Sequence, residues 1–257
     1  MIDELFTEAN VHGSVHAIDH RGAEFGFRSE EPIQPASMAK VFVLAALAER
    51  IDLTMPVQIR AGHRTPGSTG LSLMTDAAVM SVRDLAVSMI SISDNHATDL
   101  LLDVVTPAEV TATLQQRGLN ASRLSGPGRD LLDALIGGDE RSIAPATSPW
   151  STTARDLTLL MHGLWRDGSQ QIRSILGTQV ISRFAAGFAD LPVSIASKTG
   201  TLREHRGETG IVEFPDGTWV AVTVAVRTPT FDYSQPVVDD AIARAARTAV
   251  DLVRAQQ

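Results

Sequence analysis

Apolar and polar residues alternate near both ends of the chain and follow a helical spacing between them. Residues 11–27 alternate around a turn at residues 20–22, which predicts a hairpin of two strands. Residues 211–214 and 218–226 have the same period of two around a Pro-Asp-Gly turn, and they predict a second hairpin. Residues 237–255 return to helical spacing, with acids early and arginines late, as the helix dipole favours.

The middle of the chain has the pattern of helices joined by two long loops. Residues 40–50 are apolar nearly all round, which predicts a helix buried inside the protein rather than lying on its surface. Further segments with helical spacing are residues 82–92, 96–105, 107–117 and 152–165. Residues 60–71 and 125–149 are rich in Gly, Pro, Ser and Thr and are predicted to be loops.

The order strands, helices, strands, helix indicates the α+β class. The first and last parts must share a sheet if the N-terminal hairpin is to bury its apolar face, so the helical middle is an insertion beside that sheet. We predict one domain over residues 1–257, with an antiparallel β-sheet flanked by helices and an inserted all-helical lobe. The sheet lobe covers about residues 1–30 and 175–257, and the helical lobe about residues 31–174.

Composition narrows the class of partner. The formal charge of −8, without a long run of Lys or Arg, argues against nucleic acid or an anionic membrane and favours a small-molecule substrate. The longest apolar runs are too short to span a bilayer, and a monomer is expected. The acidic N-terminus lacks the order of an export signal, so a cytoplasmic protein is expected, or an exported one if a leader has been trimmed.

Lysine is rare in this chain, and its two positions point to chemistry. Among 22 Lys and Arg residues only Lys40 and Lys198 are lysines. Arginine holds its proton at any working pH, whereas a desolvated lysine can lose its proton and act as a base. We therefore expect the two lysines at positions that need a side chain able to lose its proton, which arginine does not do.

Ser37 and Lys40 are the first candidate pair. Three residues apart at the start of a helix, they face the same way with side chains in reach of each other. A hydroxyl beside a base is the minimum for an activated nucleophile, and both burial and the helix N-terminus disfavour a protonated lysine. The alternative is an N-capping serine followed by an exposed lysine.

Two rarer strings follow the Ser-Met-Ala-Lys of residues 37–40, namely Ser93-Asp94-Asn95 and Lys198-Thr199-Gly200. In this order the three strings resemble the S-x-x-K, S-D-N and K-T-G boxes of the penicillin-recognising serine hydrolases, and within them the class A β-lactamases. The likeness continues at residues 80–85, 138–141 and 151–157 and covers nearly the whole chain. It implies the fold of β-lactamases and DD-peptidases and no metal or other cofactor.

The resemblance also implies roles for the residues of the first two boxes. Ser37 would be the acylated nucleophile and Lys40 its partner base. Ser93 would relay a proton to the leaving nitrogen, and Asn95 would bind the amide side chain of the substrate. Asp94 is expected to be structural.

The third box would bind the other end of the substrate. Lys198 would keep the potential positive around Ser93, while Thr199 and Thr201 would hydrogen-bond the substrate carboxylate. The oxyanion hole would be the backbone N–H groups of Ser37 and Thr201. Gly200 would let its strand approach the substrate closely.

Other residues after the third box leave alternatives open. Arg203 and Arg206 could pair with a substrate carboxylate or could be solvated loop arginines. The lone tyrosine, Tyr233, lies near the C-terminus, so the tyrosine base that some relatives use at the middle box is not expected. Histidines 12, 16 and 20 are on a strand and turn where they would not converge on a metal ion.

One position departs from the class A pattern. Class A enzymes carry a glutamate in the long loop ahead of the Gly-Asp-Glu-Arg string, and it activates the water that frees the acyl-enzyme. An ungapped count back from Asp139 places Arg129 at that position. Asp130 and Asp133 are nearby acids that could substitute, although surface solvation is the simpler interpretation of both. The positions of the family's loop-bracing ion pair read Pro127 and Ser142.

We therefore expect a serine hydrolase that opens β-lactam amides through an acyl-enzyme on Ser37, with slow deacylation. An esterase or D-amino-acid peptidase on the same scaffold is a second hydrolytic interpretation. A binder or sensor that is acylated by β-lactams and stays acylated is a third, and the arginine at the glutamate position keeps it open.

Overall fold

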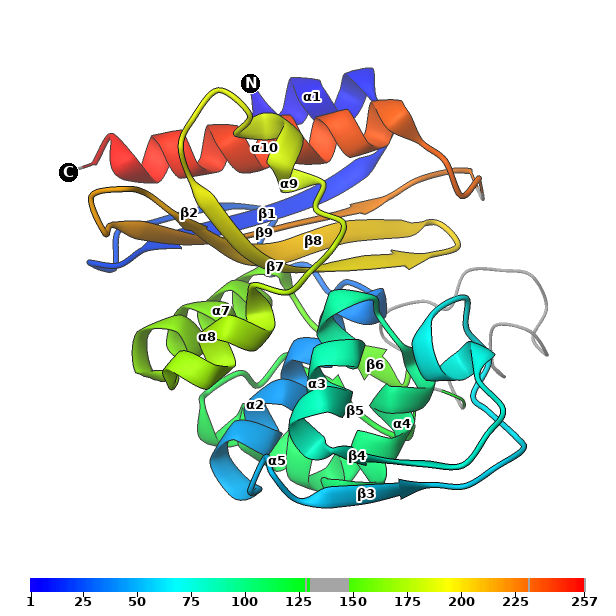
Figure 1. Cartoon of the computed structure of the whole chain (residues 1–257). Coiled ribbons are helices and arrows are strands. Elements are labelled where there is room, and N and C mark those ends of the chain that lie inside the picture. The colour runs from blue at the N-terminus through cyan, green and yellow to red at the C-terminus, as the bar shows by residue number, and fades with distance from the viewer. Residues whose placement is uncertain (128, 130–147, 231, 257) are drawn as a thin grey trace.

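The computed structural model describes residues 1–127, 129, 148–230 and 232–256. Within them, a five-stranded antiparallel sheet forms the centre of the molecule, in the order β2-β1-β9-β8-β7 (Figure 1). Its strands are β1 (His12–Asp19), β2 (Glu24–Phe27), β7 (Ser194–Leu202), β8 (His205–Glu213) and β9 (Trp219–Arg227). Strand β1 pairs with both β2 and β9. The two predicted hairpins therefore share one sheet, and the α+β fold class is confirmed.

Short polar turns close both predicted hairpins. Between β1 and β2, Asp19 Oδ1 accepts hydrogen bonds from the backbone N–H groups of Arg21 and Ala23, each at 2.9 Å. Between β8 and β9, Gly217 has a φ of +81°, in the left-handed region that glycine adopts without steric cost. Each turn thus follows from its local sequence.

Helices α1 (Ile2–Glu8), α9 (Phe184–Gly187) and α10 (Pro236–Arg254) cover one face of the sheet, above it in Figure 1. One buried apolar cluster joins Phe6 of α1, Val224 of β9 and Ile242 of α10. Of these three helices, only α10 was predicted from the pattern of apolar residues. Helices α1 and α9 have seven and four residues, too short for a periodic pattern to identify them.

The helical lobe lies against the opposite face of the sheet (Figure 1). Its larger helices are α2 (Lys40–Arg50), α3 (Val82–Ser91), α4 (Asn95–Val104), α5 (Pro107–Gln116), α7 (Ala154–Asp167) and α8 (Gln170–Leu176). Five of these were predicted to within about two residues at each end, the usual uncertainty of helix boundaries, and α8 was not predicted. Helix α7 contacts β1, β8 and β9 as well as α2, so it joins the lobe to the sheet.

Helix α2 lies at the centre of the helical lobe, as its apolar composition predicts. Every side chain from Val41 to Leu47 is completely buried, and the helix contacts α3, α4, α5 and α7. The first residue of this buried helix is Lys40. The packing of α2 therefore forces an ammonium group into the interior.

Several short elements were not predicted, because two- to four-residue segments leave no periodic signal. They are the 3₁₀ helices η1 (Ala36–Ala39) and η2 (Gly70–Leu73) and the strands β3 (Pro56–Ile59), β4 (Ala78–Ser81), β5 (Arg123–Leu124) and β6 (Trp150–Ser151). Most of the predicted 125–149 loop lies outside the described residues. Across the described part of the chain, every helix is too short or too polar to span a bilayer.

Candidate active site

Ser37 lies in η1, directly before α2, and its side chain is half-buried at the edge of a pocket. Ala36 precedes it with a φ of +50°, in a left-handed region that non-glycine residues seldom adopt. Neither η1 nor α2 has a side-chain capping hydrogen bond, so Ser37 does not cap a helix. The alternative interpretation of Ser37 as an N-cap is therefore wrong, and its hydroxyl has no capping role in the fold.

The Lys40 side chain is 1% exposed, so the alternative interpretation of an exposed lysine is also wrong. Its Nζ donates to Ser93 O at 2.6 Å, to Ser93 Oγ at 3.0 Å and to Asn95 Oδ1 at 2.8 Å. An ammonium group has three N–H donors, so these three acceptors use them all. The hydrogen bonds of Lys40 within the described residues join the first box to the second, and none goes to Ser37.

Two buried lysines donate hydrogen bonds to residues that line the pocket. Burial lowers the pKa of Lys40 to about 7, although the carboxylates of Asp94 and Asp99 act to raise it. Burial, followed by the charge of Lys40, lowers the pKa of Lys198 well below its ordinary value, while Glu208 opposes this shift. Lys198 Nζ donates to Gln179 Oε1 and to Thr199 O, both at 3.1 Å. Both lysines are thus in the desolvated state that their scarcity suggested.

Ser93 lies between α3 and α4 with a φ of +61°, a second strained backbone position beside the pocket. The following residue, Asp94, is completely buried and caps α4 through a hydrogen bond from Ala97 N–H at 3.1 Å. Its other oxygen accepts from Leu71 N–H at 2.7 Å and from Ser88 Oγ at 2.8 Å. These contacts give Asp94 the structural role expected of it. They also hold its two neighbours, Ser93 and Asn95, in place.

Strand β7 forms the opposite wall of the pocket with Thr199 and Thr201, which lie two residues apart and so face the same side. A Cβ on Gly200 would lie 2.7 Å from Pro35 O and 3.2 Å from Ala36 Cβ. The glycine therefore lets β7 pack against η1, the segment that carries Ser37. The approach of β7 to a substrate at Gly200 stays a prediction; the close packing that the structure shows there is against Pro35 and Ala36.

The pocket between these elements has a volume of about 290 Å³, close to the small end of the range for ligand sites. Residues from all three boxes line it, although they are far apart in the sequence. The lining residues are Ser37, Ser68, Thr69, Ser91, Ile92, Ser93, Asn95, Gln179, Val180, Ile181, Arg183, Thr199, Thr201 and Tyr233. None of these described lining residues is acidic.

The arginine that reaches the pocket is not one of the two that were predicted. Arg203 is exposed in the turn between β7 and β8, outside the residues that line the pocket. Arg206 is buried and pairs with Asp239, so it is not a solvated loop arginine. Instead Arg183, from the segment before α9, donates from Nη2 to Thr201 Oγ1 at 2.7 Å. No motif surrounds Arg183, so sequence reasoning missed it.

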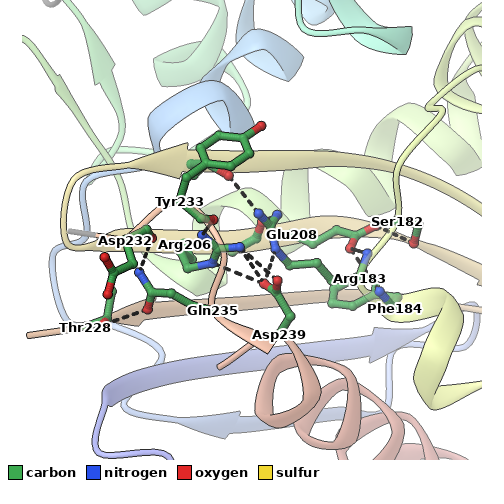
Figure 2. Close-up of polar contacts among 12 residues, drawn as sticks. Ser182, Arg183, Phe184, Arg206, Glu208, Thr228, Asp232, Tyr233, Gln235 and Asp239 are labelled. Carbon is green, nitrogen blue, oxygen red and sulfur yellow. Dashed lines mark hydrogen bonds and ion pairs between the residues drawn. The ribbon is translucent and has the colours of Figure 1, made fainter. Parts of the chain in front are cut away.

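A buried carboxylate that was also missed fixes the segment carrying Arg183. Glu208 of β8 accepts hydrogen bonds from Ser182 Oγ at 2.7 Å and from the N–H groups of Arg183 and Phe184 at 2.6 and 3.0 Å (Figure 2). It also accepts from Ser197 Oγ at 2.6 Å. Burial raises the pKa of Glu208, and these hydrogen bonds act against that rise. They attach residues 182–184 to the sheet beside Lys198.

Arg129, at the position where class A enzymes carry glutamate, has a half-exposed side chain. Its Nη1 lies 3.8 Å from Oδ2 of Asp99, which is buried on α4. The acids Asp130, Asp133 and Glu140 lie outside the described residues, as does Ser142.

Two of the three N-terminal histidines pair with carboxylates, each with a different glutamate. His12 Nε2 lies 2.6 Å from Glu31 and His16 Nε2 lies 3.2 Å from Glu24. Among the described residues, no group of three or more His, Cys, Asp or Glu side chains is placed to hold a metal ion.

Comparisons with known proteins agree with this geometry. The family Beta-lactamase2, described as the beta-lactamase enzyme family, matches residues 1–253. The beta-lactamase regulatory protein BlaB of Streptomyces cacaoi is 28% identical over an alignment of 297 positions, which covers 96% of this chain and 94% of that protein.

Solved structures show the same fold. A beta-lactamase from Sphaerobacter thermophilus DSM 20745 superposes with a TM-score of 0.80 at 24% identity, covering 98% of this chain and 96% of the other. PBP-A superposes with a TM-score of 0.78 at 20% identity and the same coverage. The family match spans nearly the whole chain and includes all three boxes, so this protein belongs to the beta-lactamase enzyme family.

Proposed function

We propose that this protein opens β-lactam amides by acyl transfer to Ser37. One observation carries the proposal. Residues from three separate boxes line a single pocket, and two buried lysines donate hydrogen bonds to residues of that lining; the box residues are Ser37, Ser93, Asn95, Thr199 and Thr201. Membership of the beta-lactamase enzyme family supports β-lactams as the substrate class. The related BlaB of Streptomyces cacaoi carries a regulatory name, which favours a second candidate, a sensor that β-lactams acylate.

In the proposed acylation, Ser37 Oγ attacks the lactam carbonyl and the carbon–nitrogen bond breaks. The neutral amine of Lys40 takes up the proton of Ser37. Ser93 Oγ, 3.0 Å from Lys40 Nζ, gives its proton to the leaving nitrogen and recovers one from Lys40. The product is an ester on Ser37 with a ring-opened amine, so no atom leaves the complex.

Charge on the substrate is stabilised at two positions in this proposal. The backbone N–H groups of Ser37 and Thr201 receive the carbonyl oxygen as it becomes negative. The substrate carboxylate binds Thr199 and Thr201, and Arg183 supplies the cation beside Thr201 in the place expected of Arg203.

Acylation should increase with pH through about pH 7. Burial lowers the pKa of Lys40 to about 7, and only the unprotonated amine present above that pH can accept the proton of Ser37. The second-order rate constant of acylation by a penicillin should rise about tenfold per pH unit well below pH 7 and level off above it. Stopped-flow or quenched mass spectrometry across this range measures it. A rate constant that is flat through pH 7 would contradict the assignment of Lys40 as base.

We further propose that deacylation is slow. No acid is among the described lining residues, and Arg129 stands where a water-activating glutamate is needed. Without a general base, hydrolysis of the ester loses a factor of about 10² to 10⁴. A chromogenic cephalosporin should therefore give a burst equal to the enzyme concentration, followed by a slow phase.

The controls for this burst are Asp130→Ala and Asp133→Ala, which remove the nearest acids in sequence. Both variants should leave the slow phase unchanged. A single fast phase in the wild type that disappears in one of them would show that the 125–149 loop supplies a base from a shifted position.

A protein acylated by β-lactams that acts as a sensor is the second candidate. The regulatory name of the BlaB relative and the lack of an acid among the described lining residues both favour it. Intact-mass spectra over time with a penicillin, a cephalosporin and a simple ester separate the candidates. An adduct that persists for hours supports the sensor, an adduct that decays supports the hydrolase, and turnover of the ester alone indicates an esterase.

A further inference from the structure

Large apolar side chains are exposed around the mouth of the pocket. Four of the lining residues have such side chains: Tyr233 (83% exposed), Val180 (71%), Ile181 (67%) and Ile92 (36%). A single exposed apolar residue is ordinary, whereas several gathered at one pocket mark a surface that binds apolar groups. The proposed acyl-transfer reaction does not use any of these four side chains.

Tyr233 is carried by a loop with its own polar core. Gln235, which is 9% exposed, donates from Nε2 to Asp232 O at 2.7 Å and accepts from Thr228 Oγ1 at 2.9 Å. Arg206 Nη1 donates to the backbone oxygen of Tyr233 at 2.8 Å. Figure 2 shows the Tyr233 ring pointing away from this network. The loop therefore holds the backbone of Tyr233 in place and leaves its ring exposed at the pocket.

The same network fixes the backbone of Tyr233 relative to Arg183, the arginine that lines the pocket. Asp239 Oδ1 accepts from Arg183 Nε at 2.6 Å, and Asp239 Oδ2 accepts from Arg206 Nη2 at 2.8 Å (Figure 2). Arg206 thus links Tyr233 to Asp239, and Asp239 links Arg206 to Arg183. The backbone of Tyr233 is therefore held at a fixed place relative to Arg183, at the pocket that both residues line.

We infer that Tyr233, with Val180 and Ile181, forms a subsite for a flat apolar group that lies next to the carboxylate of the substrate. In a cephalosporin this group is the substituent at C3 of the dihydrothiazine ring. The inference rests on the proposed function, because it names the substrates that react best at Ser37. A flat ring stacked on tyrosine gains binding that a methyl group in the same place does not.

Two cephalosporins with the same acyl side chain, one with a 3-styryl and one with a 3-methyl group, test this subsite. Tyr233→Ala should lower the second-order rate constant of acylation about tenfold for the styryl compound and leave it unchanged for the methyl compound. Tyr233→Phe should behave as the wild type. The matched control is Val79→Ala, which removes a 58% exposed apolar side chain of β4 outside the pocket and should change neither rate constant. Equal effects of Tyr233→Ala on both compounds, or no effect, would overturn the inference.

A binding measurement separates failure of the subsite from failure of the proposed function. Tyr233 is the sole tyrosine of the chain, so 3-fluorotyrosine places a single ¹⁹F nucleus on this ring. In Ser37→Ala, the styryl compound should shift this resonance and the methyl compound should not. Lack of a shift with the styryl compound would overturn the subsite. A shift without any adduct on wild-type Ser37 would overturn the proposed acyl transfer and support the subsite.

Discussion

Replacing Ser37 with alanine should abolish the covalent adduct that a penicillin forms with this protein. The wild type should gain the full mass of one β-lactam, because opening of the ring adds the molecule without expelling a fragment. Ser37 lines the pocket and caps neither η1 nor α2, so its loss should remove the nucleophile with little effect on stability. Intact-mass spectra and a thermal melt measure the two effects.

The matched control is Ser91→Ala, which removes another hydroxyl from the lining of the same pocket. The backbone oxygen of Ser91 accepts hydrogen bonds from Val180 N–H and Gln179 Nε2, and alanine keeps both. This variant should be acylated at the wild-type rate. An adduct that survives in Ser37→Ala would exclude Ser37 as its site, and peptide mapping would then locate it.

Replacing Lys40 with arginine should slow acylation by about 10²-fold or more, the usual contribution of a general base. Arginine keeps the positive charge but does not release its proton near neutral pH. The rise of the rate constant through about pH 7 should disappear as well, because it reports the ionisation of Lys40. Rapid-quench mass spectrometry of the Ser37 adduct measures both changes.

Lys198→Arg provides the matched control for this variant. The two lysines are 1% and 0% exposed, so both substitutions place a guanidinium group in a buried position beside the lining of the same pocket. We expect a smaller loss of the acylation rate for Lys198→Arg, because Lys198 is expected to act through its positive charge, which arginine keeps. If Lys40→Arg were acylated at nearly the wild-type rate, the base would have to be another group.

Chemical rescue can restore the amine at position 40. The chain has no cysteine, so Lys40→Cys contains one thiol that aminoethylation converts to a close analogue of lysine. Recovery of acylation after this modification would distinguish loss of the base from damage to the fold.

Long elements could be predicted from the sequence because each carries its own hydrophobic pattern. Helix α2 is apolar all round and is buried all round, and β8 and β9 flank a polar turn closed by Gly217. Helix α1 was missed although Ile2, Leu5 and Phe6 have helical spacing, because seven residues do not form a stable helix alone. It is stabilised by packing against α10, which lies at the other end of the chain.

The candidate site likewise has features that could be predicted from the sequence and features that could not. The three boxes determined from the sequence alone which hydroxyls and amines could perform acyl transfer, since their identity is local information. The sequence also located the unusual Arg129, whose place in the 125–149 loop follows from counting residues. What these side chains contact was not predictable, because Lys40 donates to Ser93 and Asn95, more than fifty positions away, and not to Ser37.

By itself the sequence thus determined the fold class, the order of the boxes and the choice of lysine over arginine at two positions. Only the tertiary structure decided that Arg183 rather than Arg203 enters the pocket, since Asp239 and Glu208 hold it there from distant elements. Only the tertiary structure brought the ring of Tyr233 to the pocket mouth. The pKa of about 7 at Lys40 also belongs to the fold, because desolvation depends on everything that packs around an ammonium group and not on its neighbours in sequence.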